Sequence, residues 1–540
     1  MAFSGALTLT DLNDFITPAQ ACIKPVEQKD VPEKRERDAG AASTEIRIDS
    51  SGAYYEVSSE PGLMSSNSIA SSSTTLGTNT NNKLAQAQIS LNDCLACSGC
   101  ITSAESVLIT LQSHTEVLNF LDANKSPGLG EEERKIPVVS IAPQSLASLA
   151  ASLASSCSTT TNDNITPPQV LRRLRVFLKD VLGFAHVFDT TYARELALRE
   201  HVKEFLERRA GAERGEEGSL PMLASACPGW ICYAEKAHAE MLPYIAKTKS
   251  PQQVMGTLVK SWMAPRWGKT PDGVYHVTVM PCYDKKLEAS RKDFYDEIYA
   301  TRDVDCVITT GELELMMRER GWDLSVPVVG ELDGAAHADE GVPELVQHSG
   351  TSSGSYLQSI MEHLLARSAN AEVGVKMIRN TDYEEYTITE GEKVVFKGAK
   401  CYGFRNLQNI VRKVGKEQGV RTGTGAAGRM RRTAIKKTDI EKKYDYVEVM
   451  ACPGGCVNGG GQLKPTAAVE MEGGGGDGDG DGMPSGKWGD KEWTRKVEEA
   501  YWRGESESES CELIELGVEL GLRTEYHAVE SDVIGLAVKW

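Results

Sequence analysis

The sequence contains no long apolar run and no excess of positive charge. No run in its 540 residues approaches the roughly 18 consecutive apolar residues that span a bilayer. The 59 Lys and Arg residues against 77 Asp and Glu residues give a net charge of −18, which argues against a dedicated nucleic-acid-binding protein. The start of the chain lacks the basic residues of a secretory signal and soon reaches Asp11. We therefore expect a soluble intracellular protein with no membrane span.

Patterns typical of hydrolases and of dinucleotide-binding proteins are also absent. We find neither a Ser-His-Asp triad nor paired carboxylates for hydrolysis. Residues 423–428 match G-x-G-x-x-G, but no strand precedes them and no βαβ unit surrounds them, so a flexible insertion is the better interpretation. For the basic residues that follow we favour a solvated loop over a nucleic-acid or nuclear-import patch; they are Arg429, Arg431, Arg432, Lys436 and Lys437.

Three stretches have compositions that bury too little apolar surface to fold. One is charged and then rich in Ser, Thr and Asn, one is Gly-rich and basic, and one contains the run GGGGDGDGDG. The expected layout is an amino-terminal segment at 1–25, an insertion at 26–90, a cysteine-rich segment at 91–130, a core at 131–465 with a flexible insertion at 421–437, a linker at 466–511 and a tail at 512–540.

The core alternates short apolar runs with helical patterns. Val- and Ile-rich runs, typical of parallel strands buried on both faces, occur at 136–142, 274–280, 304–310 and 445–450. Two helices are predicted, one at 252–263 after the N-cap Ser250 and one at 312–320 ending at Gly321. This alternation predicts an α/β protein with a mainly parallel sheet.

Cysteine is the informative residue type. The 13 cysteines are an odd number in a chain without an export signal, so free thiolate chemistry is favoured over disulfides. They are clustered: Cys94, Cys97 and Cys100 form a C-x-x-C-x-x-C run, and Cys452 and Cys456 bracket P-G-G. Such clustering predicts metal binding.

Four cysteines follow strand-like runs. The runs at 220–226, 274–280 and 445–451 lead to Cys227, to Cys282 and to the Cys452–Cys456 pair. Ligands of open α/β sheets lie beyond the carboxyl ends of the strands, so these four thiols could converge on one site. Glycines near Cys456 would let the backbone approach an inorganic centre, and Lys285 and Lys286 would add positive charge. Each cysteine alone could instead be a small core residue.

The C-x-x-C-x-x-C run predicts a second centre. Three such cysteines fit three corners of a 4Fe-4S cube, but Ala104 occupies the position of the usual fourth ligand. Cys22 is the candidate for that ligand, since a long intervening loop adds little closure entropy. A four-cysteine zinc site is the competing interpretation. The remaining cysteines are expected to be non-ligands, with Cys306 in the core; they are Cys157, Cys232, Cys306, Cys401 and Cys511.

Three sequence blocks resemble those of a known family. The blocks ACPGW at 226–230, MPCYDKKLE at 280–288 and ACPGGCVNGGGQ at 451–462 resemble the signatures of iron-only hydrogenases and their non-hydrogenase relatives. Together with the amino-terminal cysteines, the pattern resembles the cytosolic iron–sulfur protein assembly factors, which are related to nuclear prelamin A recognition factor. The segments at 139–145 and 402–406 agree with this resemblance.

The resemblance implies two α/β lobes around a buried cluster and two 4Fe-4S clusters. Carried over by position, the ligands are Cys22, Cys94, Cys97 and Cys100 for one cluster, and Cys227, Cys282, Cys452 and Cys456 for the other. The implied role is not enzymatic. It is the maturation of cytosolic and nuclear iron–sulfur proteins, between a scaffold and the targeting complex that serves apoproteins, in the cytosol and also in the nucleus.

Hydrogenase activity is the main alternative. Hydrogenases carry a proton-passing cysteine directly before the ligand that corresponds to Cys227, whereas this chain has Ala226, which has no transferable proton. A zinc-stabilised interaction module is the third interpretation. The final Trp540 resembles tails that dock on the targeting complex, although Lys539 departs from them and the indole could instead pack on its own domain. We expect the core cluster to be held more tightly than the amino-terminal one.

Overall fold

The structure, a computed structural model, divides the chain into two units, Met1–Ser90 and Leu91–Trp540. It describes residues 44–48, 54–58, 82–83, 108–128, 130–156, 165–216, 218–332, 341–368, 370–417, 443–464, 491–503 and 520–529. In the first unit, within the stretch expected to be an insertion, three short strands form an antiparallel sheet; they are β1 Thr44–Ile48, β2 Tyr54–Ser58 and β3 Asn82–Lys83.

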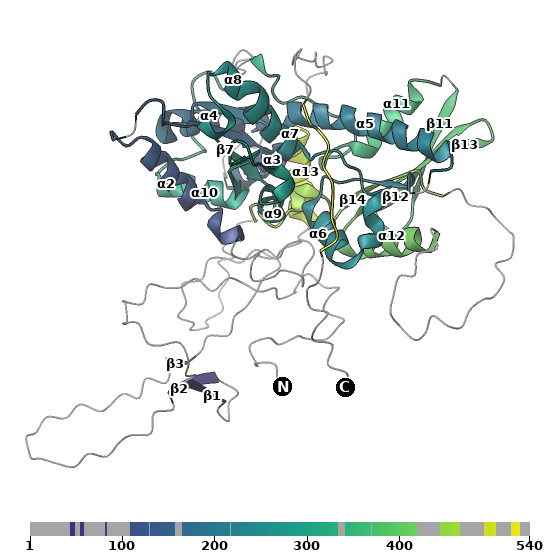
Figure 1. Cartoon of the computed structure of the whole chain (residues 1–540), viewed down its shortest axis with the longest axis horizontal. Helices are drawn as coiled ribbons and strands as arrows, with labels where there is room; N and C mark the ends of the chain where they lie inside the picture. Colours follow the sequence, from purple (N-terminus) through teal and green to yellow (C-terminus); the bar gives the residue numbers. More distant parts are fainter. Residues whose placement is uncertain are drawn as a thin grey trace, which may run out of the picture. The chain divides into compact units, whose positions relative to one another are not determined.

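The first lobe of the second unit is built on a four-stranded parallel sheet in the order β10-β7-β4-β5. Figure 1 labels β7 of this sheet among the helices of the lobe. Its strands are β4 Ile136–Ile141, β5 His186–Asp189, β7 Val274–Met280 and β10 Cys306–Thr309. Val138 and the adjacent Val139 pack into two different hydrophobic clusters, so both faces of this sheet are covered. The continuous apolar runs therefore predicted β4, β7 and β10 correctly.

The two predicted helices of this lobe are present. Ser250 precedes α7 Pro251–Thr257, which continues as a π-helical turn, Leu258–Met263. The other is α10 Thr310–Glu319, where Thr309 and Glu312 form a reciprocal capping box and Gly321 follows with φ of 66°. Other helices around the sheet are α2 His114–Asn124, α3 Pro143–Ser156, α4 Pro167–Val176, α8 Ala264–Arg266 and α9 Asp284–Ala289; β8 Tyr295–Asp296 and β9 Thr301–Arg302 form a small hairpin.

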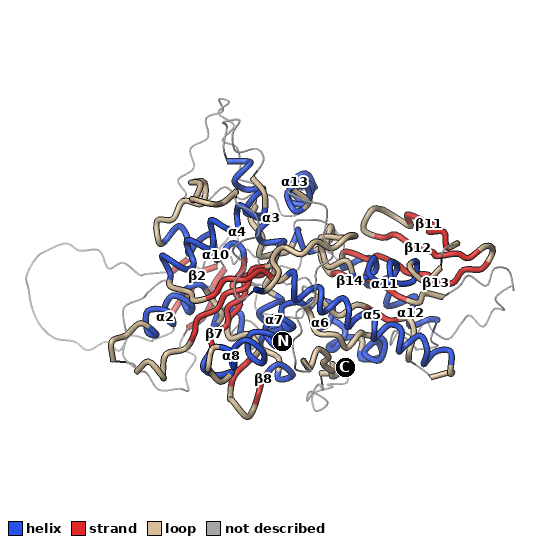
Figure 2. Tube along the Cα trace, turned by 90° about the horizontal axis from the view of Figure 1, so that it is seen from above, coloured by secondary structure: helices blue, strands red, loops and turns tan. Residues whose placement is uncertain are grey.

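The second lobe contains a five-stranded mixed sheet in the order β11-β12-β13-β14-β6, separate from the first sheet (Figure 2). Strands β13, β14 and β6 are parallel, whereas β11, β12 and β13 are antiparallel neighbours. The bounds are β6 Met222–Leu223, β11 Ala371–Met377, β12 Tyr383–Glu390, β13 Lys393–Tyr402 and β14 Tyr446–Met450. The predicted mainly parallel sheet is thus two sheets, one of them mixed.

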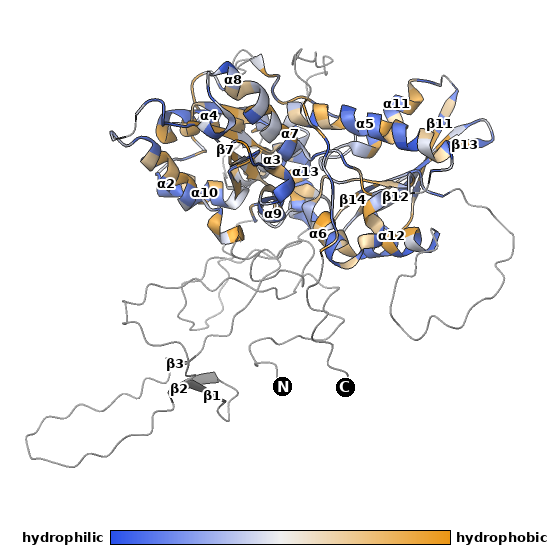
Figure 3. Ribbon diagram, in the orientation of Figure 1, coloured by the Kyte–Doolittle hydropathy of each residue, from blue (hydrophilic) through white to orange (hydrophobic). Residues whose placement is uncertain are grey.

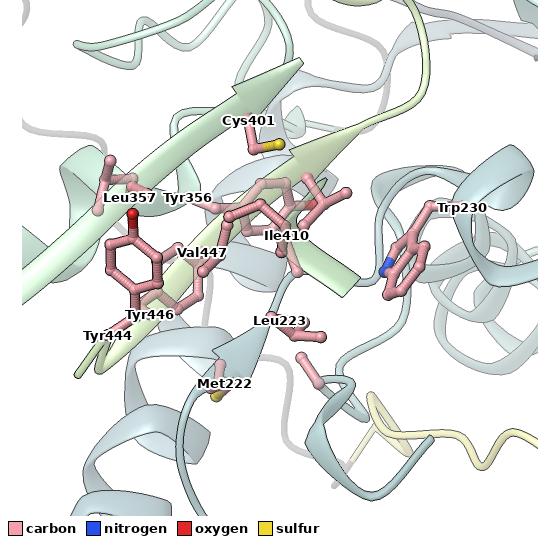
Figure 4. Close-up of a cluster of buried hydrophobic side chains, with 14 of the residues drawn as sticks. Met222, Leu223, Trp230, Tyr356, Leu357, Cys401, Ile410, Tyr444, Tyr446 and Val447 are labelled. Atoms are coloured by element: carbon pink, nitrogen blue, oxygen red, sulfur yellow. The ribbon is translucent and has the colours of Figure 1, made fainter. Parts of the chain in front are cut away.

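Helices pack on the second sheet and enclose its core. They are α6 Pro228–Ala237, α11 Tyr356–Leu365 and α12 Phe404–Glu417. Figure 4 shows Met222 and Leu223 of β6 in this core with Tyr446 of β14 and Trp230 of α6. The amphipathic helices turn their apolar residues inward, as the hydropathy colouring of α12 illustrates (Figure 3).

One long helix joins the two lobes. Helix α5 Thr191–Glu213 places Tyr192 in a hydrophobic cluster with Val138 of the first lobe. Further along the same helix, Leu198 and Phe205 pack into the core of the second lobe. Figure 1 shows α5 extending from one lobe to the other. The relative position of the two sheets is therefore set by a shared rigid element.

Two parts of the expected linker and tail are ordered against the lobes. Helix α13 Lys491–Tyr501 buries Trp493, Val497 and Ala500 and packs on α3. The segment 520–529 bonds back to the lobes, where the Lys249 amide donates to the Leu522 carbonyl at 2.8 Å. None of the helices in the described ranges is long and apolar enough to cross a membrane.

Candidate metal centre

The four cysteines predicted for the core site lie in three loops, each beyond the carboxyl end of a parallel strand. Cys227 follows β6 and is the N-cap of α6. Cys282 follows β7 of the first lobe, and Cys452 and Cys456 follow β14 of the second lobe. Cys227 is buried and the other three are half-buried. The strand-end prediction is therefore correct for the position of all four in the topology.

Direct contacts join the three loops to one another. Lys285, three residues after Cys282, donates from Nζ to the carbonyl oxygen of Ala226 at 3.1 Å. The amide of Ala451 donates to Cys227 Sγ at 3.4 Å. The amide of Gly461 donates to the carbonyl of Pro281 at 2.9 Å. Each cysteine loop thus touches the others, and residues 229 positions apart in sequence meet at one place.

The protonation of the thiols reflects their burial and their proximity. Burial is the largest cause that raises the pKa of Cys227, to about 12, and a second contribution comes from Cys456. Burial also raises the pKa of Cys282 and of Cys452 well above the ordinary value, with each affected by the neighbouring thiols. For Cys456 burial again raises the pKa, while positive Lys285 opposes it. Metal binding here must therefore displace protons from the sulfurs.

A buried lysine supplies positive charge beside these thiols. Burial lowers the pKa of Lys285, which is the largest single effect. The negative Glu288, Cys282 and Cys456 together raise that pKa by more than burial lowers it, so the net shift is upward. Its Nζ lies 2.8 Å from Glu288 Oε2, and Gln252 Nε2 donates to the same oxygen at 3.0 Å. Lys285 is therefore a fixed cation. Lys286, expected to share this role, instead pairs with Glu312 at 2.7 Å and with the Gln112 carbonyl.

The glycines of the third block approach protein atoms closely. A Cβ on Gly459 would lie 2.3 Å from the Pro281 carbonyl oxygen, and one on Gly461 would lie 2.6 Å from Thr309 Cγ2. Gly455 has φ of 85°, and its Cβ would meet Ser353 Oγ. These glycines thus let the loop that carries Cys456 dock on the loop that carries Cys282. The sequence predicts that these glycines let the backbone approach an inorganic centre. In the structure, Gly459 and Gly461 also let the backbone of this loop approach the first lobe.

The chemistry of the donor atoms bears on which metal fits. Within the described residues, no three Cys, His, Asp or Glu side chains come close enough to hold a single ion. Four sulfurs around one zinc would lie about 3.8 Å apart, given Zn–S distances of about 2.3 Å. A four-iron cube holds its cysteine sulfurs farther apart, because iron and sulfide atoms lie between them. The donor set of four thiols suits an iron–sulfur cluster, and a zinc ion would accept the same ligands.

Sequence reasoning missed three polar residues around Cys456 and Lys285. Ser353 Oγ accepts from the Cys456 amide at 2.9 Å, and Arg194 of α5 lies buried near the same cysteine and donates to Tyr501 at 2.6 Å. Gln252 holds Glu288 in place. These residues come from elements remote in the sequence, and only the segment that begins at Ser250 carried a local signal, its N-cap.

The other sequence-predicted residues separate into two groups. Cys306 is buried in β10 as predicted, Cys401 is buried in β13, and Cys232 is half-buried on α6. Several residues named above lie outside the described part of the chain; they are Cys22, Cys94, Cys97, Cys100, Cys157, Cys511 and Trp540, with the glycine-rich and basic residues at 423–437.

Comparison with known proteins gives relatives of full length. Residues 135–460 match the family described as iron only hydrogenase large subunit, C-terminal domain. The cytosolic Fe-S cluster assembly factor NAR1 of Cryptococcus neoformans is 46% identical over 93% of this chain and 86% of its own. The cytosolic iron-sulfur assembly component 3 of Mus musculus is 42% identical over 100% of this chain and 99% of its own.

Solved structures with the same fold are hydrogenases. An apo variant of the [FeFe]-hydrogenase HydA1 from Chlamydomonas reinhardtii superposes with a TM-score of 0.54 at 25% identity, covering 77% of this chain and 99% of its own. A second [FeFe]-hydrogenase, studied for oxygen damage to its H cluster, gives a TM-score of 0.55 at 25% identity. The two lobes around the cysteines are thus the hydrogenase architecture, and the fold predicted from the sequence blocks is confirmed.

Proposed function

Since the chain belongs to the cytosolic Fe-S cluster assembly factors, which share the iron-only hydrogenase large-subunit domain, we propose that it serves the maturation of cytosolic and nuclear iron–sulfur proteins through clusters bound to its own cysteines. The observation that carries this proposal is the direct contact among the three loops that carry the four cysteines. The names of both relatives refer to the cytosol. We therefore assign the activity to that compartment.

The core ligands are Cys227, Cys282, Cys452 and Cys456, which would hold one 4Fe-4S cluster and fix the two lobes against each other. The charge of Lys285 offsets the negative charge that four thiolates bring to a buried site. The amide of Ala451 donates to Cys227 Sγ, and the glycines let the cysteine loops pack closely against one another. This chain's residues would thus bind the cluster and balance its charge, and the cluster would supply electron-transfer or cluster-donor chemistry when bound.

A second 4Fe-4S cluster would be held by Cys22, Cys94, Cys97 and Cys100. Support comes from the C-x-x-C-x-x-C spacing, which wraps three corners of a cube. The ligands of this site come from short, separated segments, whereas the core ligands come from strand ends in two packed lobes. We infer that the amino-terminal cluster exchanges faster and is the one passed on or sensed.

Hydrogen catalysis is disfavoured for this chain. A proton must reach the reacting metal through a side chain that can give and take it. Ala226 lies directly before Cys227, and its methyl side chain has no transferable proton, while its carbonyl oxygen accepts from Lys285. The chain therefore acts as a carrier or adaptor between a cluster scaffold, the targeting complex and apoproteins, with the Trp540 tail as a docking segment.

Mössbauer spectroscopy on anaerobically purified, iron-57-labelled protein tests the cluster assignment. We expect about eight irons per chain in two 4Fe-4S populations. Cys452→Ser should remove the core population alone, and Cys97→Ser the amino-terminal population alone. Cys401→Ser, a buried cysteine outside both sets, should leave both. Zinc in place of iron, or an additional low-spin di-iron signal, would overturn the assignment.

A cell-based assay tests the role itself. In cells depleted of the endogenous factor, the wild-type chain should restore the activity of a cytosolic iron–sulfur enzyme and leave a mitochondrial one unchanged. The Cys452→Ser and Cys97→Ser variants should fail, whereas Cys401→Ser should succeed. Rescue by a variant that holds no iron would contradict a cluster-dependent role. Removing Trp540 and measuring capture of the targeting complex tests the docking segment, and unchanged capture would refute it.

A further inference from the structure

The free edge of the second lobe's sheet is formed by β11. Among the described strands, β11 pairs only with β12, and it lies at the outer end of the sheet in two views (Figures 1 and 2). Every residue from Glu372 to Met377 is exposed, and Val375 and Met377 keep 59% and 58% of their surface in contact with solvent. Exposed edges that carry apolar side chains are sites where another strand can add.

The hydrogen bonds of the hairpin show which backbone groups of β11 are free. The amide of Ile378 donates to the Tyr383 carbonyl at 3.0 Å, and residues 378 and 383 continue the register of the pair. Antiparallel strands alternate between bonded and non-bonded positions, so the even-numbered residues of β11 bond to β12. The N–H and C=O groups of residues 371, 373, 375 and 377 therefore point outward, away from the sheet.

The sequence of β11, AEVGVKM, is complementary to itself when a second copy runs antiparallel and Gly374 lies on the two-fold axis. In that register Glu372 faces Lys376, Val373 faces Val375, and Ala371 faces Met377, each pair occurring twice. The outward-pointing groups of residue 373 then meet those of residue 375. Charge, side-chain and backbone complementarity thus select the same register.

The two charges are available for such pairing. In the described part of the chain neither Glu372 nor Lys376 takes part in an ion pair. Lys376 lies opposite Glu385 in the β12 register, but the carboxylate of Glu385 is bonded to Tyr444 and lies 3.4 Å from both Lys397 and Lys413. Charged residues that only protect an edge strand from pairing need no symmetric placement. Glu372 and Lys376, by contrast, lie two residues before and two residues after Gly374.

We propose that two copies of this chain associate through antiparallel pairing of β11 with β11, which joins their second-lobe sheets into one continuous sheet. The partner is therefore a second copy of the same chain, and the interface is isologous. The pairing leaves the cysteine loops untouched, because β11 lies at the opposite end of the sheet from β6 and β14. It is independent of the proposed cluster function.

Charge reversal distinguishes self-pairing from any other occupant of the edge. Sedimentation velocity of the full-length, cluster-loaded protein over a wide concentration range should show a reversible monomer–dimer equilibrium. Glu372→Lys alone, or Lys376→Glu alone, creates two like-charge contacts and should raise the dissociation constant about tenfold or more. The double variant Glu372→Lys/Lys376→Glu should dimerise as wild type does. An equal mixture of the two single variants should form heterodimers, although neither associates by itself.

A backbone variant keeps the test decisive. Val375→Pro removes an outward-facing N–H and spares the bonds to β12, so it should abolish dimers while circular dichroism and iron content stay unchanged. The proposal is overturned if the wild-type chain stays monomeric at every concentration, or if dimers persist in the proline variant. It is also overturned if the mixture of single variants stays monomeric, since the edge would then serve a different molecule or another segment of the chain.

Discussion

The two sheets of the second unit differ in the relative direction of their strands. All four strands of the first-lobe sheet are parallel and lie buried between helices, whereas the second-lobe sheet adds the antiparallel strands β11 and β12 to its parallel strands. Every cysteine of the core site follows a parallel strand, and the β11–β12 hairpin carries none. The candidate metal ligands thus lie at the carboxyl ends of parallel strands, whereas the antiparallel strands give the second sheet an exposed edge at β11.

Replacing one of the proposed core ligands should have the largest effect on iron content and stability. Because metal-binding free energy is partly folding free energy, Cys456→Ser should abolish core-site iron and lower the free energy of unfolding by about 3 kcal/mol or more. Anaerobic iron analysis and thermal unfolding measure both effects. Cys401→Ala, in β13 of the same sheet, is the matched control and should keep its iron. Equal iron loss in both variants would contradict a special role for strand-end cysteines.

Breaking the buried ion pair beside the site should have the next largest effect. Lys285→Met leaves the carboxylate of Glu288 buried without its cation, which costs about 3–5 kcal/mol. The double variant Lys285→Met/Glu288→Gln removes both charges and should recover much of that loss. Denaturant unfolding of the three proteins measures the difference. If the double variant is as unstable as Lys285→Met, packing rather than charge explains the effect.

Each lobe contains a buried histidine that should make its stability depend on pH. Burial lowers the pKa of His276 in β7 to about 3 and that of His201 in α5 to about 4, from an ordinary value of 6.5. Below pH 6.5 the unfolded chain takes up protons that the folded chain refuses, so each histidine lowers stability by about 1 kcal/mol per pH unit as the pH falls toward its folded pKa.

Replacement of these histidines should flatten the dependence of stability on pH. Ser140 Oγ lies 2.7 Å from His276 Nε2 and the Asp303 carbonyl 3.1 Å from Nδ1, so His276→Asn keeps polar groups in place. Unfolding measured from about pH 7.5 to about pH 5.5 should show a smaller slope for this variant than for wild type. His201→Asn should act likewise. Identical slopes would show that neither histidine stays neutral in the folded chain.

The smallest effect is expected at the carboxyl-terminal segment that crosses α5. Arg523 lies 2.6 Å from Glu200 and 2.7 Å from Glu207 on the surface. Because such exposed pairs are screened by solvent, Arg523→Ala should lower the free energy of unfolding by about 1 kcal/mol or less. Denaturant titration at low and high salt checks this, and Arg318→Ala, which breaks an exposed helix pair, is the control.

The contrast between the sheets also explains what the sequence could predict. Strands β4, β7, β10 and β14 were predictable because burial on both faces gives continuous Val and Ile runs. Strand β12, with the sequence YEEYTITE, was missed because three glutamates interrupt its apolar residues, and one of them, Glu385, is buried through contacts with Tyr444 and Lys397 that the sequence does not reveal. Helix α13 was missed because it follows a glycine-rich run, although Trp493, Val497 and Ala500 recur at helical spacing.

The candidate site shows the same limit. Motif spacing identified the four cysteines and Lys285, since these lie in local blocks at strand ends. The partners that position them are Ser353, Arg194 and Gln252, which reach the site from loops and helices far away in sequence. No local pattern marks such residues, because their role arises only when the lobes are packed.

The distance in sequence between Cys227 and Cys456 also orders the events of biosynthesis. A chain that grows on the ribosome exposes Cys227 while the other three proposed ligands are still unmade, and the proposed set is complete only after 229 further residues have been added. The metal therefore cannot act as an early folding nucleus, and the lobes must assemble from their own apolar contacts first. The newly made protein is then itself a client for cluster insertion before it can serve others.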